Sequence, residues 1–363
     1  MSAGQESSPA KLSIGVVLPG LSRAPAGGYK VVYDYCNDLA GFGHRVTIYH
    51  APLLAGARNR ARPHRERLSD FVRHLGVRRQ RPRWHALSGL VMVKNSPRLD
   101  VRRIGYHDVL VATAAETAPL VLEAAAASGA AGAYFIQHDE QWVGAEQRGA
   151  SWRLPLQHIV IAPWLRQISE AHGHRPILVP NAIDTTHFSD EAGERDIAVL
   201  AMISDKPFKR PDLVIQAMNR LAADGETCVT FGTIDRPAAL DPRVVHHREP
   251  SRDLLRRLYA SAQVYLCASD AEGWHLPPAE AMASGCSVVS TAIPGVLAYA
   301  DDVGLFAPVG DGPGLIRHTR ALLGDPAQRQ DRGARGAALM RSYTPDDAAR
   351  AFEAALHTAR ARA

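Results

Sequence analysis

The segment with the clearest chemical content is DAEGWHLPPAEAMASGCSVVS, residues 270–290. Glu272 follows an apolar run of strand length, and Glu280 lies eight positions later, in the first turn of a predicted helix. Backbone N–H groups beside a helix N-terminus favour phosphate and hydroxyl oxygens, and here they come from Gly273, Trp274, His275 and Leu276. Two carboxylates beside them can accept hydrogen bonds from adjacent hydroxyls of a carbohydrate. Alternatively, Glu280 only adds favourable negative charge at the helix N-terminus.

Apolar runs and turn residues predict the elements that position these side chains. In the second half of the chain, strands are predicted at 197–202, 227–231, 264–268 and 287–290, with helices at 211–223, 251–260 and 277–284. In the first half, strands are predicted at 12–18, 45–49, 108–112, 133–137 and 159–162. A helix is expected from about Tyr29, after the Gly27-Gly28 loop, and the last ~50 residues are expected to be mostly helical.

Strands that alternate with helices predict parallel sheets covered on both faces. Two such series predict an α/β protein with two Rossmann-like, doubly wound domains, residues 1–182 and 183–344. A C-terminal helix at about 345–363 is expected to pack back on the first domain. Because ligands of such sheets bind beyond the carboxyl ends of the strands, we expect the site in a cleft where the two domains face each other.

The composition is that of an ordinary globular protein, with 363 residues, 46% hydrophobic and 22% charged. No apolar run is long enough to span a bilayer, and the polar N-terminus lacks a signal-peptide core. We therefore expect a cytoplasmic protein, either soluble or peripheral at the membrane. The four cysteines have no paired or zinc-ligand spacing, which favours buried, reduced thiols: Cys36, Cys228, Cys267 and Cys286.

The positive charge is concentrated in one segment. Residues 58–103 contain fourteen Lys and Arg residues and three acidic ones. Such a segment is either a solvated insertion or a surface for an anionic acceptor, a membrane or nucleic acid. Trp84 is almost the only aromatic residue in it that could stack on bases, which argues against nucleic acid.

The segment at 272–289, EGWHLPPAEAMASGCSVV, resembles the EGFGLPxxEAMAxGxPVV motif of retaining glycosyltransferases of family 4 and their relatives. The matching residues are Glu272, Gly273, Leu276, Pro277, Glu280, Ala281, Met282, Ala283, Gly285, Val288 and Val289. The resemblance implies the GT-B fold and a nucleotide-sugar donor. Glu280 would hold the ribose hydroxyls, Glu272 the donor sugar, and the backbone of 273–276 the sugar and diphosphate. Trp274 and His275 replace residues that are typically Phe and Gly, which leaves the sugar open.

Other segments are similar to the same family. VPNAID, residues 179–184, resembles the usual entry to its C-terminal domain. Lys209 and Arg210 resemble the basic opening of the helix that follows the first strand of that domain, where the family binds the diphosphate. The family has an Arg five residues before this Lys, and Ser204 stands there in this chain. Either Lys206 or Arg210 is expected to supply the missing charge, with Arg210 favoured. Alternatively, Lys209 and Arg210 are ordinary surface residues of a helix.

The first domain contributes two further candidates. Gly28 resembles the family's N-terminal Gly-Gly loop, where a backbone without a side chain approaches the phosphate or the acceptor. His138 follows a predicted strand and resembles a His that faces the donor sugar, and Trp142 could stack on a sugar. A plain turn and a structural histidine are the alternatives. FIQHDEQW and IAPWLRQI also resemble, loosely, a subgroup of bacterial rhamnosyltransferases.

The resemblance implies transfer with retention of anomeric configuration. No Asp-x-Asp pair is present, and we expect no metal or other cofactor beside the nucleotide sugar. An inactive, nucleotide-sugar-binding relative is the main alternative because of Ser204. An NAD-dependent dehydrogenase is disfavoured, since the first loop lacks G-x-G-x-x-G and His50 stands where an acidic residue would bind ribose. The base, the sugar, the acceptor, the linkage and the oligomeric state are not readable from the sequence.

Overall fold

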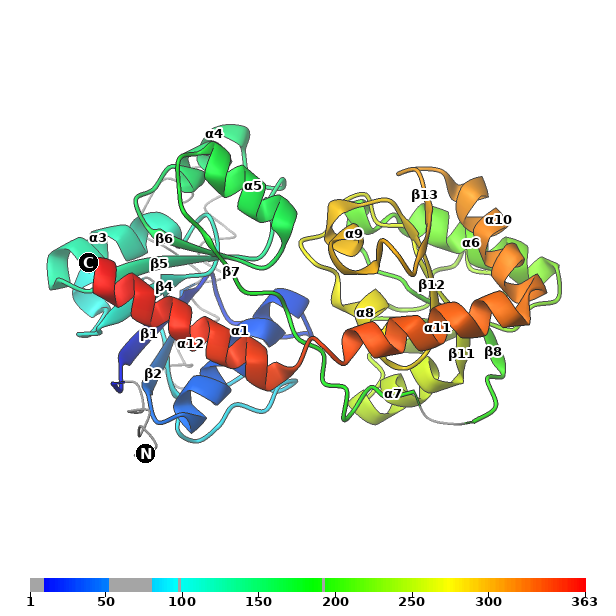
Figure 1. Cartoon of the computed structure of the whole chain (residues 1–363), viewed down its shortest axis with the longest axis horizontal. Coiled ribbons are helices and arrows are strands. Elements are labelled where there is room, and N and C mark those ends of the chain that lie inside the picture. The colour runs from blue at the N-terminus through cyan, green and yellow to red at the C-terminus, as the bar shows by residue number, and fades with distance from the viewer. Residues whose placement is uncertain (1–9, 52–79, 97–98, 191–192) are drawn as a thin grey trace, which may run out of the picture. The chain divides into compact units, whose positions relative to one another are not determined.

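The computed structural model describes residues 10–51, 80–96, 99–190 and 193–363. The chain divides into two compact units (Figure 1). Unit 1 contains residues 1–160, 166–179 and 349–363, and unit 2 contains residues 161–165 and 180–348. The chain enters unit 2 briefly at residues 161–165 and again at residue 180, and it returns to unit 1 at residue 349.

Unit 1 is built on a parallel sheet that has seven strands among the described residues. Its strand order is β3-β2-β1-β4-β5-β6-β7. The strands are β1 (Ser13–Leu18), β2 (Arg45–His50), β3 (Met92–Asn95), β4 (Val109–Ala112), β5 (Ala131–Ile136), β6 (Gln157–Val160) and β7 (Ile177–Leu178). The helices are α1 (Gly27–Gly41), the short η2 (Val101–Arg103), α3 (Ala118–Ser128), α4 (Ala145–Trp152), α5 (Pro163–Ala171) and α12 (Pro345–Arg362).

The last helix, α12, is coloured red in Figure 1 and packs in unit 1. The ring of Phe352 stacks on Tyr35 of α1, with 4.4 Å between the ring centroids. Glu353 Oε1 lies 2.7 Å from Nε2 of His44, at the start of β2. Burial of this helix face explains why the chain's last segment joins its first domain.

Unit 2 repeats the arrangement with a sheet of six strands among its described residues, in the order β10-β9-β8-β11-β12-β13. The strands are β8 (Ile197–Met202), β9 (Cys228–Gly232), β10 (Val245–Arg248), β11 (Ala262–Cys267), β12 (Ser287–Thr291) and β13 (Leu305–Ala307). The helices are the short η3 (Pro207–Lys209), α6 (Pro211–Ala223), α7 (Arg252–Ser261), α8 (Leu276–Ala283), α9 (Pro294–Ala300), α10 (Gly312–Gly324) and α11 (Pro326–Met340). Helix α6 lies beside α10, and α8 beside α11 (Figure 1).

The prediction of two doubly wound α/β domains is confirmed. In each sheet the chain starts in the middle, proceeds to one edge and then returns to build the other side, which is the order of a dinucleotide-binding fold. The sequence did not predict β3, β7, β10 or β13. Strand β7 has two residues, and β10 (VHHR) is a half-exposed edge strand without an apolar pattern. All four cysteines lie in the described part of the chain and are buried with free thiols.

Candidate functional site

The topology of unit 2 brings two loops together that are far apart in the sequence. Strands β8 and β11 are parallel neighbours, with Leu266 opposite Ala201 near their carboxyl ends. The β8–α6 loop (residues 203–210) and the β11–α8 loop (residues 268–275) therefore leave the sheet side by side. These strands also flank the point at which the strand order reverses, where ligands of open α/β sheets bind.

A lysine and a glutamate join the two loops. Lys209 Nζ lies 2.6 Å from Oε1 of Glu272. The side chains are 19% and 10% exposed, so the pair is largely shielded from solvent. Ser269 Oγ donates a second hydrogen bond to the same oxygen, at 3.0 Å. The structure thus brings two of the predicted catalytic residues into direct contact.

The charge on Glu272 is stabilised by its neighbours. Burial alone raises the pKa of this carboxyl, but His275 and Lys209, with the hydrogen bonds from Lys209 and Ser269, outweigh that effect and hold the pKa below its ordinary value. Glu272 is therefore ionised at neutral pH, and it can accept hydrogen bonds from ligand hydroxyls but cannot act as a general acid.

Arg210 strengthens the link between the loops. Its Nη1 donates to Oδ1 of Asp270 at 3.2 Å, and its Nε donates to Oδ1 of Asp212 at 3.0 Å. The backbone N–H of Asp270 donates to the carbonyl of Phe208 at 2.7 Å. Arg210 has φ 49° and ψ 58°, a left-handed conformation that costs of order 1–3 kcal/mol for a residue with a side chain. Its ion pair with Asp270 helps to offset that cost.

Of the two remaining candidates in the β8–α6 loop, Ser204 is half-buried and Lys206 is exposed. Ser204 Oγ accepts a hydrogen bond from the backbone N–H of Lys206, at 3.3 Å. The ammonium of Lys206 lies 3.6 Å from Asp205, and its side chain is 60% exposed. Of the two cations expected to replace the family's arginine, Arg210 is the one that contacts the β11–α8 loop, through Asp270.

Glu280 is more buried than the sequence suggested. Helix α8 begins at Leu276, so Glu280 is its fifth residue and lies in the second turn. The prediction of a first-turn position was wrong, and the helix-dipole alternative weakens because that effect falls off within the first turn. Glu280 is 8% exposed, and Tyr259 of α7 donates a hydrogen bond to its Oε2 at 3.2 Å. Burial, and next the charge of Glu280, raise the pKa of Tyr259 well above its ordinary value, so this phenol stays a donor.

Trp274 and Gly273 fix the backbone path between the two glutamates. The Trp274 side chain is 2% exposed and packs on Tyr299 of α9, with 4.4 Å between ring centroids. Only its backbone is therefore available to a ligand. Gly295, at the start of α9, lies against the same loop, because a Cβ added there would be 2.4 Å from the carbonyl oxygen of Glu272. Sequence reasoning missed Ser269, Tyr259 and Gly295, because their roles depend on contacts between elements.

His275 precedes α8 with φ 64° and ψ 87°, a second left-handed residue with a side chain. Its Nδ1 lies 3.3 Å from Sγ of Cys267, and its Nε2 lies 3.5 Å from Oε1 of Glu272. Burial raises the pKa of the Cys267 thiol, but the charge and hydrogen bond of His275 outweigh it and lower that pKa.

In unit 1, the two candidates follow β1 and β5, on opposite sides of β4. Gln137 Nε2 donates to the carbonyl of Gly28 at 3.1 Å, which ties the start of α1 to the end of β5. A Cβ at Gly28 would approach nothing in the described residues closer than 3.5 Å, so packing does not require a glycine there. His138 packs on Trp142, with 4.7 Å between ring centroids, and Trp142 is largely exposed.

Most of the basic segment, including Arg78 and Arg79, lies outside the described residues. Arg81 is described and has a structural role. Its guanidinium donates to the carbonyls of Leu87 and Ser88 at 2.9 Å and of Val91 at 2.7 Å. Arg81 is therefore a poor candidate for contact with an anionic acceptor.

A cluster of titratable side chains joins α12 to the start of β2: His44, Glu353 and His357. The backbone N–H of Leu12 donates to His44 Nδ1 at 2.9 Å, so the ring proton of neutral His44 is on Nε2. That Nε2–H points at Glu353 Oε1, 2.7 Å away. His44 thus uses both ring nitrogens within the protein, and the cluster acts as a tie between elements.

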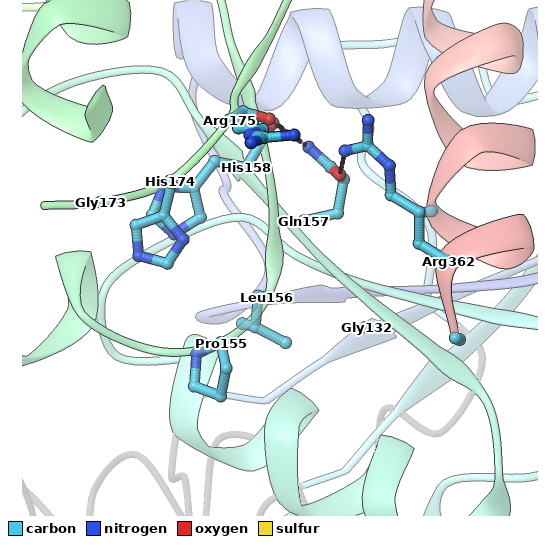
Figure 2. A pocket seen from close by; sticks show the side chains of 11 residues that line it. Gly132, Pro155, Leu156, Gln157, His158, Gly173, His174, Arg175 and Arg362 are labelled. Atoms are coloured by element: carbon cyan, nitrogen blue, oxygen red, sulfur yellow. Dashed lines mark hydrogen bonds between the residues drawn. The ribbon is translucent and has the colours of Figure 1, made fainter.

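The cavity drawn in Figure 2 lies at the amino ends of strands β5 and β6 in unit 1. It has a volume of about 350 Å³ and is lined by the starts of β5 and β6, the segment after α5 and the end of α12. Arg362 Nη1 donates to Gln157 Oε1 at 2.6 Å across it. None of the predicted site residues lines this cavity, since they follow the carboxyl ends of the strands.

Solved structures identify the class of fold. The chain is similar to sucrose-phosphate synthase from Thermosynechococcus elongatus, with a TM-score of 0.74 and 16% identity over 97% of this chain and 100% of that chain. It is also similar to HepE from Anabaena in complex with UDP-glucose (TM-score 0.71, 12% identity, 96% and 100% covered). A third match is the catalytic domain of starch synthase IV from Arabidopsis thaliana bound to ADP and acarbose (0.66, 12%, 97% and 100%). The chain therefore has the GT-B fold.

A family match lies in unit 2. Residues 194–325 match the family described as glycosyl transferases group 1, and this stretch contains Lys209, Glu272 and Glu280. The matched stretch lies within unit 2 and covers less than half of the chain. No protein with a curated description matches the sequence. In the part of the chain that the structure describes, no helix is long and apolar enough to cross a membrane.

Proposed function

We propose that the chain transfers a sugar from a nucleotide-sugar donor to an acceptor hydroxyl. The observation that carries the proposal is the contact between Lys209 and Glu272 at the strand-order reversal of unit 2. It supports the proposal because a cation that suits a diphosphate lies beside an ionised carboxylate that suits sugar hydroxyls, at the edge of the sheet where ligands of this topology bind.

The residues around this pair have distinct proposed roles. Lys209 and Arg210 stabilise the charge that develops on the departing diphosphate, helped by backbone N–H groups of 273–276 at the start of α8. Glu272 accepts hydrogen bonds from the donor sugar. Glu280, whose carboxylate is oriented by Tyr259, accepts them from the ribose. Ser204 contributes a hydroxyl at the position where glycosyltransferases of family 4 have an arginine.

The proposed transfer retains the anomeric configuration. The bond between the anomeric carbon and the phosphate oxygen breaks, and a bond to the acceptor oxygen forms on the same face of the sugar. The acceptor's hydroxyl proton passes to the departing phosphate oxygen, so no protein nucleophile is needed. We also propose that no divalent ion is required, because Lys209 and Arg210 supply positive charge at the diphosphate. Activity should then persist in EDTA.

Unit 1 is proposed to bind the acceptor. The Gly28 backbone and the His138 side chain lie at the carboxyl side of its sheet, and Trp142 offers an exposed aromatic face for a sugar. The basic segment suggests an anionic or membrane-associated acceptor. Acceptor use that is unchanged after charge reversal of Arg78 and Arg79 would remove the support for that suggestion.

A catalytically inactive nucleotide-sugar-binding protein is the second candidate, and Ser204 is the residue that favours it. One assay separates the two. The chain is incubated with UDP-, GDP-, dTDP- and ADP-glucose, and release of the nucleoside diphosphate to water is followed. We expect release from one donor series, reduced about 10²-fold in Lys209→Ala and unchanged in Lys206→Ala. Donor binding without release supports the inactive alternative, and wild-type release by Lys209→Ala contradicts the proposed site.

A further inference from the structure

His275 has a side chain where its backbone conformation favours glycine. Its φ of 64° lies in the left-handed region that glycine adopts without strain, and the resembling motif typically has Gly at this position. The side chain is 3% exposed, so it does not point to solvent. A strained residue is kept only where its surroundings determine it, and such residues gather at functional sites. The contacts of the imidazole are therefore informative.

Both ring nitrogens face titratable groups. Nδ1 lies 3.3 Å from Cys267 Sγ, at the end of β11, and Nε2 lies 3.5 Å from Glu272 Oε1. The other elements packed here supply Tyr299 of α9, whose hydroxyl donates to the His275 carbonyl at 2.9 Å, and Lys209 on the far side of Glu272.

The proton positions follow from these partners. Glu272 is ionised and can only accept, so the nitrogen that faces it carries the proton. Nδ1 then either accepts the Cys267 S–H or, as an imidazolium, donates to the thiolate. In both states Nε2 carries a proton and lies 3.5 Å from Glu272 Oε1, an ion-pair distance at which the structure shows no hydrogen bond. The histidine thus presents the positive side of an N–H group to this carboxylate, and Cys267 sets the ring's orientation.

The three groups around Glu272 all approach the same oxygen. Lys209 Nζ, Ser269 Oγ and His275 Nε2 lie 2.6, 3.0 and 3.5 Å from Oε1. Among the described residues, none makes a hydrogen bond to Oε2. The arrangement occupies one oxygen of the carboxylate and leaves the other free for a ligand.

We propose that His275 is a positioning residue, which with Cys267 orients Glu272 so that its Oε2 accepts a hydroxyl of the donor sugar. This role rests on the proposed function, since it requires a nucleotide-sugar donor at this site. The glycine that is usual in the motif at the position of His275 has no side chain and cannot orient Glu272 in this way. The positioning role also predicts that the sugar, and not the nucleotide, depends on His275.

The test uses calorimetry to compare the affinity for UDP with the affinity for UDP-glucose. The same comparison is made between GDP, dTDP or ADP and the corresponding nucleotide sugar. The variant His275→Gly removes the imidazole and relieves the left-handed backbone, so it should keep the wild-type melting temperature or exceed it. It should bind the nucleoside diphosphate as the wild type does and the nucleotide sugar about tenfold more weakly. His275→Asn, which also tolerates the left-handed region but is too short to reach Glu272, should behave likewise.

Two further readouts separate orientation from packing. In His275→Gly, the acid limb of the pH profile for nucleotide-sugar binding should move to higher pH, because Glu272 loses a group that lowers its pKa. In the ligand-free wild type, long-range ¹H–¹⁵N NMR of the His275 ring should show Nε2 protonated from pH 6 to pH 9. The proposal would be overturned if His275→Gly weakened the binding of the nucleoside diphosphate and of the nucleotide sugar equally, or if the acid limb of the pH profile did not move. It would also be overturned if Nε2 of the wild-type ring carried no proton. If the wild type binds no nucleotide at all, the proposed function fails, and the NMR result still decides the orientation of the ring.

Discussion

Replacing Lys209 by Met leaves the Glu272 carboxylate largely buried without its closest cation. The two charged atoms lie 2.6 Å apart, and the side chains are 19% and 10% exposed. Breaking a fully buried ion pair costs about 3–5 kcal/mol. Because Lys209 keeps some contact with solvent, and because Ser269 and His275 remain, we expect a loss of about 2 kcal/mol in the free energy of unfolding at pH 7.

This loss should depend on pH in a defined direction. The folded protein holds the pKa of Glu272 below its ordinary value, so the pair stabilises the fold fully above the ordinary carboxyl pKa of about 4. The stabilisation disappears as the pH falls through the lowered pKa. The difference between the wild type and Lys209→Met should therefore shrink when unfolding is measured at progressively lower pH.

Urea unfolding followed by circular dichroism at pH 7 and at pH 3.5 measures both effects. Lys206→Met is the matched control, because its ammonium is 3.6 Å from Asp205 on an exposed side chain and its removal should cost well under 1 kcal/mol. If Lys209→Met is no less stable than Lys206→Met at pH 7, the pair does not hold the two loops together. A difference between wild type and Lys209→Met that grows on acidification would refute the assigned charge state of Glu272.

Three other changes test neighbouring parts of the site. Gly295→Ala should lower the free energy of unfolding by about 2 kcal/mol, because its Cβ would lie 2.4 Å from the carbonyl oxygen of Glu272. The control Gly324→Ala, whose Cβ would have no atom within 4 Å, should be neutral or stabilising. Equal melting temperatures of the two variants would contradict the packing argument. Trp274→Ala should cost about 3–5 kcal/mol in chemical unfolding because the indole is buried against Tyr299, and a loss confined to activity would contradict that structural role. Activity measured in EDTA should equal that in magnesium, and strict dependence on magnesium would exclude the metal-free mechanism.

The sequence predicted the fold because its apolar runs have strand lengths and alternate with amphipathic helices in two series. It missed short or edge strands such as β7 and β10, whose pairing comes from neighbouring strands and not from their own patterns. The contact between Lys209 and Glu272, which are 63 residues apart, depends on β8 and β11 being neighbours. That adjacency follows from the complete strand order and is absent from local spacing.

Side-chain orientation was less predictable than position. The motif indicated Glu280 and Trp274 as residues of the donor site. It did not indicate that Tyr259 donates a hydrogen bond to Glu280, or that the Trp274 side chain packs in the core against Tyr299. The left-handed backbone of His275 had one sequence signal, since glycine is typical at this place in the resembling motif. The partners of its ring could be found only from the packing of β11 against the following loop.

The most direct test of a nucleotide-sugar site in unit 2 is thermal unfolding with UDP, GDP, dTDP and ADP and their glucose derivatives, with and without magnesium. A ligand that binds only the folded state raises the melting temperature with its occupancy. We predict a rise with one nucleotide series, independent of magnesium and lost in Glu280→Ala. No rise with any of these ligands, or an equal rise in Glu280→Ala, would contradict the proposed site.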